Sequence, residues 1–369
     1  MTAQSAQTRI TTDTLDLMRI PGLSGHEDRV RRALRSKLEA MGIESSADRL
    51  GNLVAHFPGQ GPKVMLFTHM DQLGFIVRRI EADGLIRLER LGGVPERALA
   101  AQEVLICVGE GRDVPGVIAN KCHHATTPEE KYKVLPYAEL YVDTGMCSAE
   151  EVEAAGIRIG TPVVYAPHAS TLAHGRIMGT SVDDRAGCAV LLEVARQLKA
   201  RESGPPVDLA FTVLEEFNLR GAQPLAQQLL PDIAIQIDLA LATDTPDMGA
   251  RGDVTLGGGP GMGLYSFHGR GTLNGVIPHP AMVHLMEESA AAEGLPLQRS
   301  AQVGVLTDLS YVQLVGAGVA SIDLCFPMRH SHSARELCDA RDLAALAQLL
   351  SAALARITPD FDLDRDAYT

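Results

Sequence analysis

The stretch Val64-Met65-Leu66-Phe67-Thr68-His69-Met70-Asp71 decides the fold, because it joins a buried strand to polar residues at its end. Val64 to Phe67 form a continuous apolar run, which follows the turn residues Gly59-Gln60-Gly61-Pro62. Continuous rather than alternating apolar residues are typical of a strand that is buried on both faces, as in a parallel sheet. The stretch therefore predicts a sheet covered on both sides, with His69 and Asp71 where one strand ends.

Alternating strands and helices continue after Gly179. Apolar runs predict strands at residues 207–214, 233–239 and 319–326, and apolar residues at helical spacing predict helices at residues 186–198, 221–230, 279–292 and 343–357. Strands that alternate with helices imply a parallel or mixed sheet covered by helices. We therefore predict the α/β fold class, with a mixed sheet sandwiched by helices.

A helix is also predicted before the first strand. Its apolar residues recur at helical spacing and are Val30, Leu34, Leu38 and Met41. Ser24 and Glu27 lie three residues apart, as in a capping box, in which each side chain binds a backbone amide at the helix start. We expect Ser24 to begin this helix.

Residues 73–167 differ from the rest of the chain, because short β-like runs follow one another with Gly and Pro between them. Asp83-Gly84 is typical of a hairpin turn, and only one weak helix is predicted, at Ser148–Ala155. A length of 369 residues suggests about two domains. We predict a discontinuous α/β domain of residues 1–72 and 168–369, interrupted by a β-rich domain of residues 73–167.

The charge balance excludes several classes of protein. The chain has 33 Lys and Arg residues against 46 Asp and Glu, which gives 33 − 46 = −13 and a pI near 5.4. Proteins that bind nucleic acids show a basic face, so we expect no nucleic-acid partner. No run of about 18 apolar residues predicts a membrane span, and Met1 to Arg9 lack the apolar stretch of a signal peptide. We expect a cytoplasmic protein without membrane contact.

Cysteine and aromatic usage narrow the chemistry further. The six cysteines are scattered, and no two have the CxxC spacing of a thiolate zinc site or a redox motif. The chain has no Trp and only 4% aromatic residues, which removes the usual stacking platforms for bases or sugars.

Potential metal ligands gather where the predicted strands end. They are His69 and Asp71, Glu215 and Glu216, Asp238, and His330 and His332, with Asp183 and Asp184 just before the helix at 186. Taken singly, the paired aspartates could be a helix N-cap and the paired glutamates a solvated loop. Sites in open α/β sheets form at the carboxyl ends of strands. Carboxylates that converge there repel one another unless cations lie among them or their pKa values are strongly raised.

The donor types predict the metal and the reaction. Imidazole with carboxylate, and no thiolate, suits zinc, cobalt or manganese. Two His and three carboxylates suffice for two metal ions about 3.5–4 Å apart that share one carboxylate. One further acidic residue is left as a general base on the attacking water. The natural reaction of such a site is hydrolysis of an amide or ester.

Six motifs occur in order along most of the chain. They are Pro21-Gly22-Leu23-Ser24-Gly25-His26-Glu27, Asp48-Arg49-Leu50-Gly51-Asn52-Leu53, His69-Met70-Asp71-Gln72-Leu73-Gly74-Phe75, Ser181-Val182-Asp183-Asp184-Arg185-Ala186-Gly187, Glu215-Glu216-Phe217-Asn218-Leu219-Arg220-Gly221-Ala222 and Arg329-His330-Ser331-His332-Ser333 with Glu336. Together they resemble the M42 family of metallo-aminopeptidases, which includes glutamyl and tetrahedral aminopeptidases. The family implies hydrolysis of the N-terminal peptide bond of peptides, with two divalent metal ions per subunit, zinc first and cobalt or manganese as alternatives.

The resemblance implies a role for each candidate residue. One metal ion would be held by His69, Asp183 and Asp238, and the other by Asp183, Glu216 and His332, with Asp183 bridging. Glu215 would be the general base that takes a proton from the attacking water and delivers it to the leaving amine. Asp71 would accept a hydrogen bond from His69 and fix its orientation. Family spacing prefers Asp238 to Asp244, and the family motif prefers His332 to His330.

The resemblance also implies an assembly. Residues 73–167 would form a small β-barrel-like dimerisation domain, and the chain would be a homo-oligomer between a dimer and a dodecamer. His124 falls near a family His in this insertion. It would either approach a neighbouring subunit's active site or lie on the surface. Phe217-Asn218 and Arg329-His330 depart from the family pattern. Asn tolerates the left-handed conformation better than most residues, so we expect Asn218 to preserve its turn.

The same residues leave three alternative functions to compare. A deacylase or amidohydrolase acting on small N-acyl compounds would need the same metal ligands. A glycosidase also uses paired carboxylates, but it would leave two His residues idle. A non-catalytic assembly protein on this fold would normally have lost ligands, whereas all five proposed ligands and the base are present.

Overall fold

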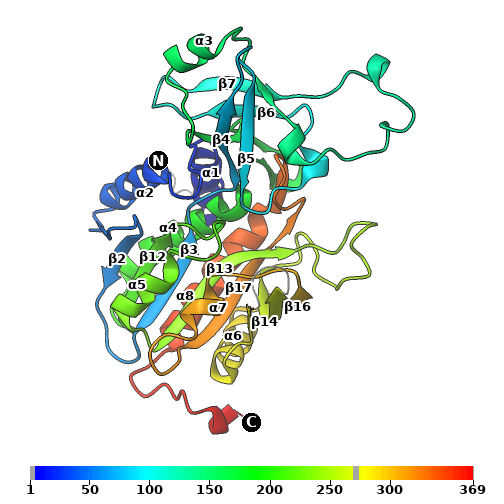
Figure 1. The fold of residues 1–369 in the computed structure, drawn as a ribbon. Helices are drawn as coiled ribbons and strands as arrows, with labels where there is room; N and C mark the ends of the chain where they lie inside the picture. The colour runs from blue at the N-terminus through cyan, green and yellow to red at the C-terminus, as the bar shows by residue number, and fades with distance from the viewer. Residues whose placement is uncertain (1–4, 269–273, 369) are drawn as a thin grey trace.

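The computed structural model describes residues 5–268 and 274–368, in which twelve strands form one mixed sheet (Figure 1). The main path runs β1-β2-β12-β3-β13-β17-β18-β11-β10, and β14, β15 and β16 extend the sheet beside β17. The strands are β1 (Ser46–Ala47), β2 (Leu53–Phe57), β3 (Val64–His69), β10 (Ala169–Thr171), β11 (Arg176–Gly179), β12 (Val207–Thr212), β13 (Ile233–Leu241), β14 (Gly261–His268), β15 (Asn274–Val276), β16 (Gln298–Val303), β17 (Ala320–Arg329) and β18 (Glu336–Asp339). The predicted fold class, a mixed sheet sandwiched by helices, is confirmed.

Four parallel strands form the centre of the sheet, in the order β12-β3-β13-β17. All six residues of β3 are buried. Its alternate side chains serve opposite faces, because Val64 and Leu66 belong to one apolar core while Met65 and Phe67 belong to another. The continuous apolar run is therefore explained by burial on both faces, and the four parallel strands end at one common edge.

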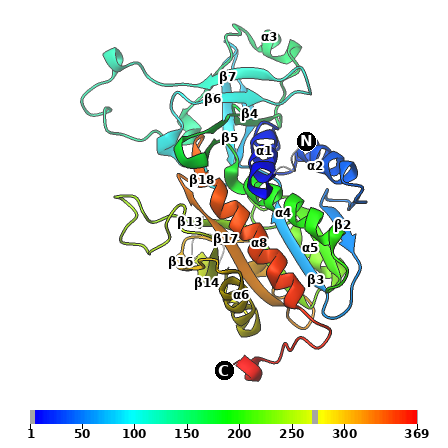
Figure 2. The same ribbon diagram turned by 180° about the vertical axis from the view of Figure 1, so that it is seen from behind.

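Helices cover both faces of this sheet. They are α1 (Ala6–Met18), α2 (Asp28–Ala40), α4 (Val182–Ala200), α5 (Ala222–Leu229), α6 (Pro280–Glu293), α7 (Leu309–Val312) and α8 (Ala340–Arg356). Apolar residues of α1, α2, α4, α6 and α8 share one core, and those of α5 and α7 share the core of the opposite face. Figure 2 shows α4 and α8 in front of the sheet, whereas α5 and α7 face the viewer in Figure 1.

The predicted capping box is wrong. Helix α2 begins at Asp28, and no side chain caps its first turn. Ser24 instead donates a hydrogen bond to Asp71, and Glu27 accepts hydrogen bonds from the amides of Gly25 and Leu214. The S-x-x-E spacing is present, but partners from distant parts of the chain occupy both side chains.

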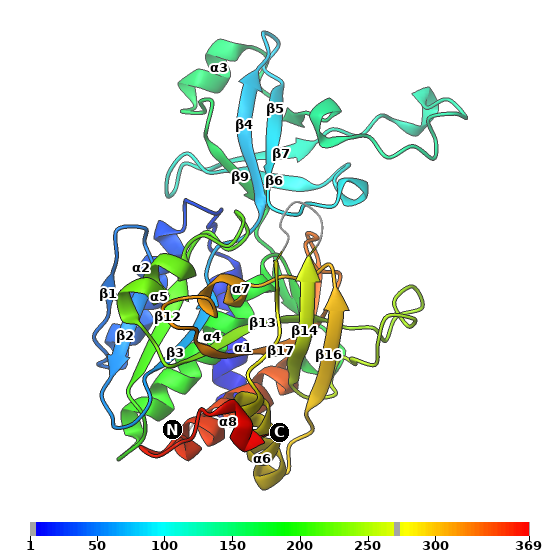
Figure 3. The ribbon, with the colours of Figure 1, turned by 60° about the horizontal axis from the view of Figure 1, so that its bottom comes forward.

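The inserted segment forms a closed barrel with the strand order β4-β5-β8-β7-β6-β9. These strands are β4 (Gly74–Ile80), β5 (Ile86–Leu91), β6 (Glu103–Ile106), β7 (Val114–Ile118), β8 (Val142–Asp143) and β9 (Pro162–Tyr165), accompanied by helix α3 (Ala149–Ala154). The Asp83-Gly84 turn joins β4 to its antiparallel partner β5. Figure 3 shows the barrel beyond the carboxyl edge of the sheet, and β14 beside β16.

A long segment protrudes from the barrel between β7 and β8 (Figure 1). It carries the short 3-10 helix His123–Ala125, and His124 is exposed on it. Tyr132 and Val134 are also exposed there. Within residues 5–268 and 274–368, none of the helices is long and apolar enough to cross a membrane.

Candidate metal centre

The predicted ligands meet at the edge where the parallel strands end. His69 closes β3, Asp238 lies in β13, and Asp183 lies at the start of α4. Glu216 follows β12, and His332 follows β17. The structure brings them together in two groups, His69 with Asp183 and Asp238, and Asp183 with Glu216 and His332. Within each group the candidate ligand atoms all lie within 4.8 Å of one another.

Asp183 faces both imidazoles. Its Oδ1 lies 3.0 Å from Nε2 of His69, and its Oδ2 lies 3.5 Å from Nε2 of His332. Oε1 of Glu216 lies 3.7 Å from the same nitrogen of His332. A carboxylate with one oxygen toward each group has the arrangement that a bridging ligand between two metal ions requires.

Each imidazole is oriented through its other nitrogen. Nδ1 of His332 lies 3.1 Å from the carbonyl oxygen of Gly93, which can only accept a hydrogen bond. Nδ1 of His69 lies 3.3 Å from Oδ1 of Asp71. Both contacts favour a hydrogen on Nδ1, so each Nε2 faces Asp183 and would bind a metal ion through its lone pair when the cation replaces its proton. The residues thus fit a dinuclear metal centre in donor type as well as in position.

Burial and hydrogen bonding shift the pKa values of the acidic side chains at this site. Burial raises the pKa of Asp238 and of Glu215 well above the usual range, and it raises that of Glu216 to about 7. Burial alone would also raise the pKa of Asp183, but hydrogen bonds with His332 and His69 hold it below its usual range. Divalent cations among these carboxylates would favour their ionised forms.

The paired aspartates, Asp183 and Asp184, have different contacts. Asp184 accepts hydrogen bonds from the amide of Gly187, at 2.9 Å, and from the hydroxyl of Thr68. The helix-capping interpretation therefore holds for Asp184, which binds an amide in the first turn of α4. Asp183 points into the centre instead, and the peptide bond between the two residues is cis.

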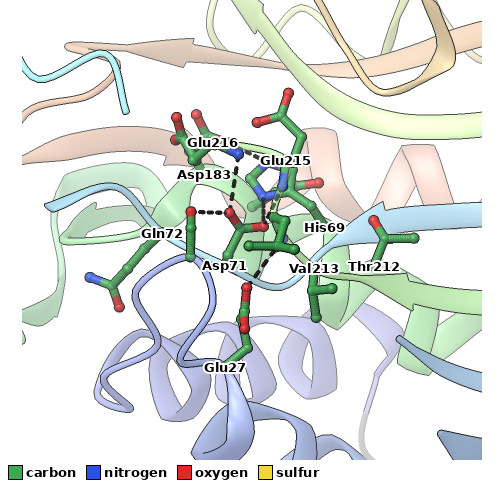
Figure 4. A network of polar contacts seen from close by, with 12 residues as sticks. Glu27, His69, Asp71, Gln72, Asp183, Thr212, Val213, Glu215 and Glu216 are labelled. Carbon is green, nitrogen blue, oxygen red and sulfur yellow. Dashed lines mark hydrogen bonds and ion pairs between the residues drawn. The ribbon is translucent and has the colours of Figure 1, made fainter. Parts of the chain in front are cut away.

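Asp71 connects the first group to the loop after β12 (Figure 4). Its Oδ1 accepts from the amide of Glu215 and its Oδ2 from that of Glu216, each at 3.1 Å. The hydroxyl of Ser24 is a further donor to Asp71. One buried carboxylate therefore holds His69 and the backbone of both glutamates in fixed relation.

Glu336, which belongs to the last motif but has no predicted role, occupies the corresponding position at the second group. Its Oε2 accepts from the amide of Asp183 at 3.1 Å, and its Oε1 accepts from the amide of His332 at 2.8 Å. The side chain is buried, and it contributes no atom to either metal-binding group. Glu336 thus ties together the backbones that present two ligands from distant segments.

Glu215 lines a cavity of about 770 Å³ together with ligands of both groups. Barrel residues Arg90, Gly92 and Gly93 line the same cavity, so both parts of the chain build its wall. A buried carboxylate that lines this cavity beside a candidate metal centre has the position of a general base.

The two departures from the family pattern leave the centre intact. Asn218 has φ 70°, the left-handed conformation that was expected for it, and Phe217 is half exposed under the guanidinium of Arg220. His330 also has a positive φ, 61°, and its side chain is exposed. Asp244, the alternative to Asp238, forms a bidentate pair with Arg329 instead of joining the metal-binding groups.

The family model of M42 glutamyl aminopeptidase matches residues 51–349 of the chain. The chain belongs to the M42 family. Membership makes it a hydrolase of the aminopeptidase type, which confirms the activity predicted from the motifs. The deacylase, glycosidase and non-catalytic alternatives are not favoured by this match.

Individual members of the M42 family resemble the chain over nearly its whole length. Lysyl aminopeptidase of Pyrococcus furiosus is 33% identical over 343 residues, which are 92% of this chain and 95% of the relative. The structure of aminopeptidase APDkam598 from Desulfurococcus kamchatkensis superposes with a TM-score of 0.90 at 31% identity and covers 99% of both chains. The TET1 peptidase of Pyrococcus horikoshii, described as assembling into a tetrahedron or a large octahedral shell, has a TM-score of 0.84 at 26% identity, over 94% of this chain and 99% of that one.

Proposed function

We propose that this M42 aminopeptidase works with two divalent metal ions held by the two groups described above. His69, Asp183 and Asp238 would hold one ion, and Asp183, Glu216 and His332 the other. The observation that carries the proposal is the orientation of Asp183, whose two oxygens face the two imidazoles at 3.0 and 3.5 Å. The donor set suits zinc first, and cobalt or manganese as alternatives, because it contains imidazole and carboxylate but no thiolate.

The residues around the two groups supply the rest of the chemistry. When bound, the ions lower the pKa of a water molecule and polarise the scissile carbonyl. Glu215 would take the proton from the attacking water and return it to the leaving amine. Asp71 would keep Nε2 of His69 directed at its metal ion by accepting the hydrogen on Nδ1. Glu215 therefore moves the proton, while Asp71 holds a ligand.

We also propose the domain division predicted from the sequence. Residues 1–72 and 168–369 would form the catalytic domain, and residues 73–167 an inserted dimerisation domain of a homo-oligomer. The closed barrel and its protruding segment with exposed Tyr132 support this proposal. The described assembly of the Pyrococcus horikoshii relative supports an oligomer larger than a dimer.

The proposed substrate is a peptide with a free N-terminus, and blocking the amine tests it. A panel of aminoacyl p-nitroanilides with acidic, basic and neutral residues should be hydrolysed. Their N-acetylated counterparts should lose at least about 100-fold in kcat/KM, because a site built to bind an amine discriminates strongly against its absence. The measurement is the initial rate of nitroaniline release with each metal ion. Equal or faster release of nitroaniline from the acetylated substrates would overturn the requirement for a free amine, whereas release of acetate with no nitroaniline would indicate a deacylase.

A further inference from the structure

Four consecutive backbone amides after β12 are each bound by a side chain. The amide of Val213 donates to Oδ1 of Asn52 at 3.0 Å, and the amide of Leu214 donates to Oε1 of Glu27 at 3.1 Å. The next two amides, of Glu215 and Glu216, donate to the two oxygens of Asp71. We call these four residues the catalytic loop, since the proposed base and one proposed ligand end it.

The two acceptors at the start of the loop are themselves fixed. Oε1 of Glu27 also accepts from the amide of Gly25 at 2.7 Å, and the side chain is only 4% exposed. The amide group of Asn52 donates to Oδ2 of Asp48 at 2.6 Å and to the carbonyl of Gly221 at 3.0 Å. Rigid acceptors of this kind define where the bound amides lie, because breaking the hydrogen bond of a buried amide costs free energy.

The catalytic loop needs such support because it is neither helix nor strand. Leu214 has φ 60°, a left-handed conformation that few residues other than Gly and Asn adopt. The backbone of Gly221 approaches the carbonyl of Val213 so closely that an added Cβ would lie 1.9 Å from its oxygen. The chain therefore makes a tight reversal next to Glu215, and the side-chain acceptors compensate for hydrogen bonds that a regular element would provide.

We propose that Glu27 and Asn52 are positioning residues, which set the place of Glu215 by holding the amides of Leu214 and Val213. The proposal rests on the function proposed above for Glu215. Figure 4 shows Glu27 below the loop, on the side away from Asp183. Glu27 contributes no atom to either metal-binding group. Its effect should therefore appear in the proton-transfer step and leave metal binding unchanged.

The decisive comparison is between Glu27→Ala and Glu27→Gln. A single oxygen of Glu27, Oε1, accepts both amides, and the amide oxygen of Gln can accept them equally. We expect Glu27→Ala to lower kcat by about 30-fold, with KM within about threefold of wild type and two metal ions per chain. This loss is smaller than the 10²–10⁴-fold that a general base contributes, because the base is displaced and not removed. Glu27→Gln should retain kcat within about threefold. His26→Ala is the matched control, because His26 is the exposed neighbour of Glu27.

A readout without substrate tests the same contacts. In Glu27→Ala and in Asn52→Ala, hydrogen exchange at residues 213–216 should accelerate by at least about tenfold, and the helix α4 should keep its wild-type protection. Unchanged exchange in both variants, or a Glu27→Gln enzyme as impaired as Glu27→Ala, would overturn the positioning role. If wild-type enzyme hydrolyses no aminoacyl substrate while the exchange result holds, the proposed function fails and the loop contacts stand.

Discussion

Replacing Glu215 with Gln should lower kcat by about 10²–10⁴-fold, because general bases contribute that much to proton transfer. The amide of Gln has the shape of the carboxylate but cannot take a proton from the attacking water. Glu215 belongs to neither metal-binding group, so both metal ions should remain bound. The measurement is kcat on an aminoacyl p-nitroanilide, with the metal content of the same sample determined by mass spectrometry.

Glu202→Gln is a suitable control for this experiment. Glu202 is exposed and lies outside the cavity that Glu215 lines, so this variant should keep wild-type kcat and metal content. A Glu215→Gln enzyme with more than about a third of wild-type kcat would refute the role of Glu215 as the base. Loss of metal from that variant would instead assign Glu215 to the metal centre.

Asp183→Asn should release metal from both groups at once, since Asp183 is their shared residue. Changing residues that only orient a ligand costs about 10–100-fold in metal affinity. Removal of a shared ligand charge should therefore cost more than about 100-fold at each group. A calorimetric titration with zinc should show two tightly bound equivalents of zinc per chain in wild type and none in the variant.

Asp244→Asn provides the matched control. Asp244 is another aspartate near the carboxyl edge, but its carboxylate pairs with Arg329. This variant should bind two equivalents with wild-type affinity. If Asp183→Asn keeps one tight equivalent, the two groups do not share Asp183, and the centre must be assigned differently.

The residues that the sequence predicts well are those whose surroundings are local. The apolar run from Val64 to Phe67 predicts β3, since both faces of that strand are covered. His69 lies at its end because the strand direction puts it there. The edge of a parallel sheet then collects the ends of several strands, so the meeting of the five proposed ligands follows from the order of the elements.

Other features depend on contacts that spacing does not reveal. Helix α1 is not predicted, because two of its five buried residues, Asp13 and Thr14, are polar. Asp13 is stabilised by Lys37 and Arg196 from two other helices. Glu27 looks like part of a capping box until the fold brings Leu214 to it. Residues that hold the backbone of a site are therefore harder to identify from sequence than the ligands themselves.

The most direct test of the dinuclear centre is a crystal structure of the zinc-loaded enzyme, with anomalous diffraction recorded at the zinc edge. The account predicts two anomalous peaks on either side of Asp183, one beside His69 and Asp238 and the other beside Glu216 and His332. Fewer than two peaks at these residues, in crystals of fully active enzyme, would contradict the account.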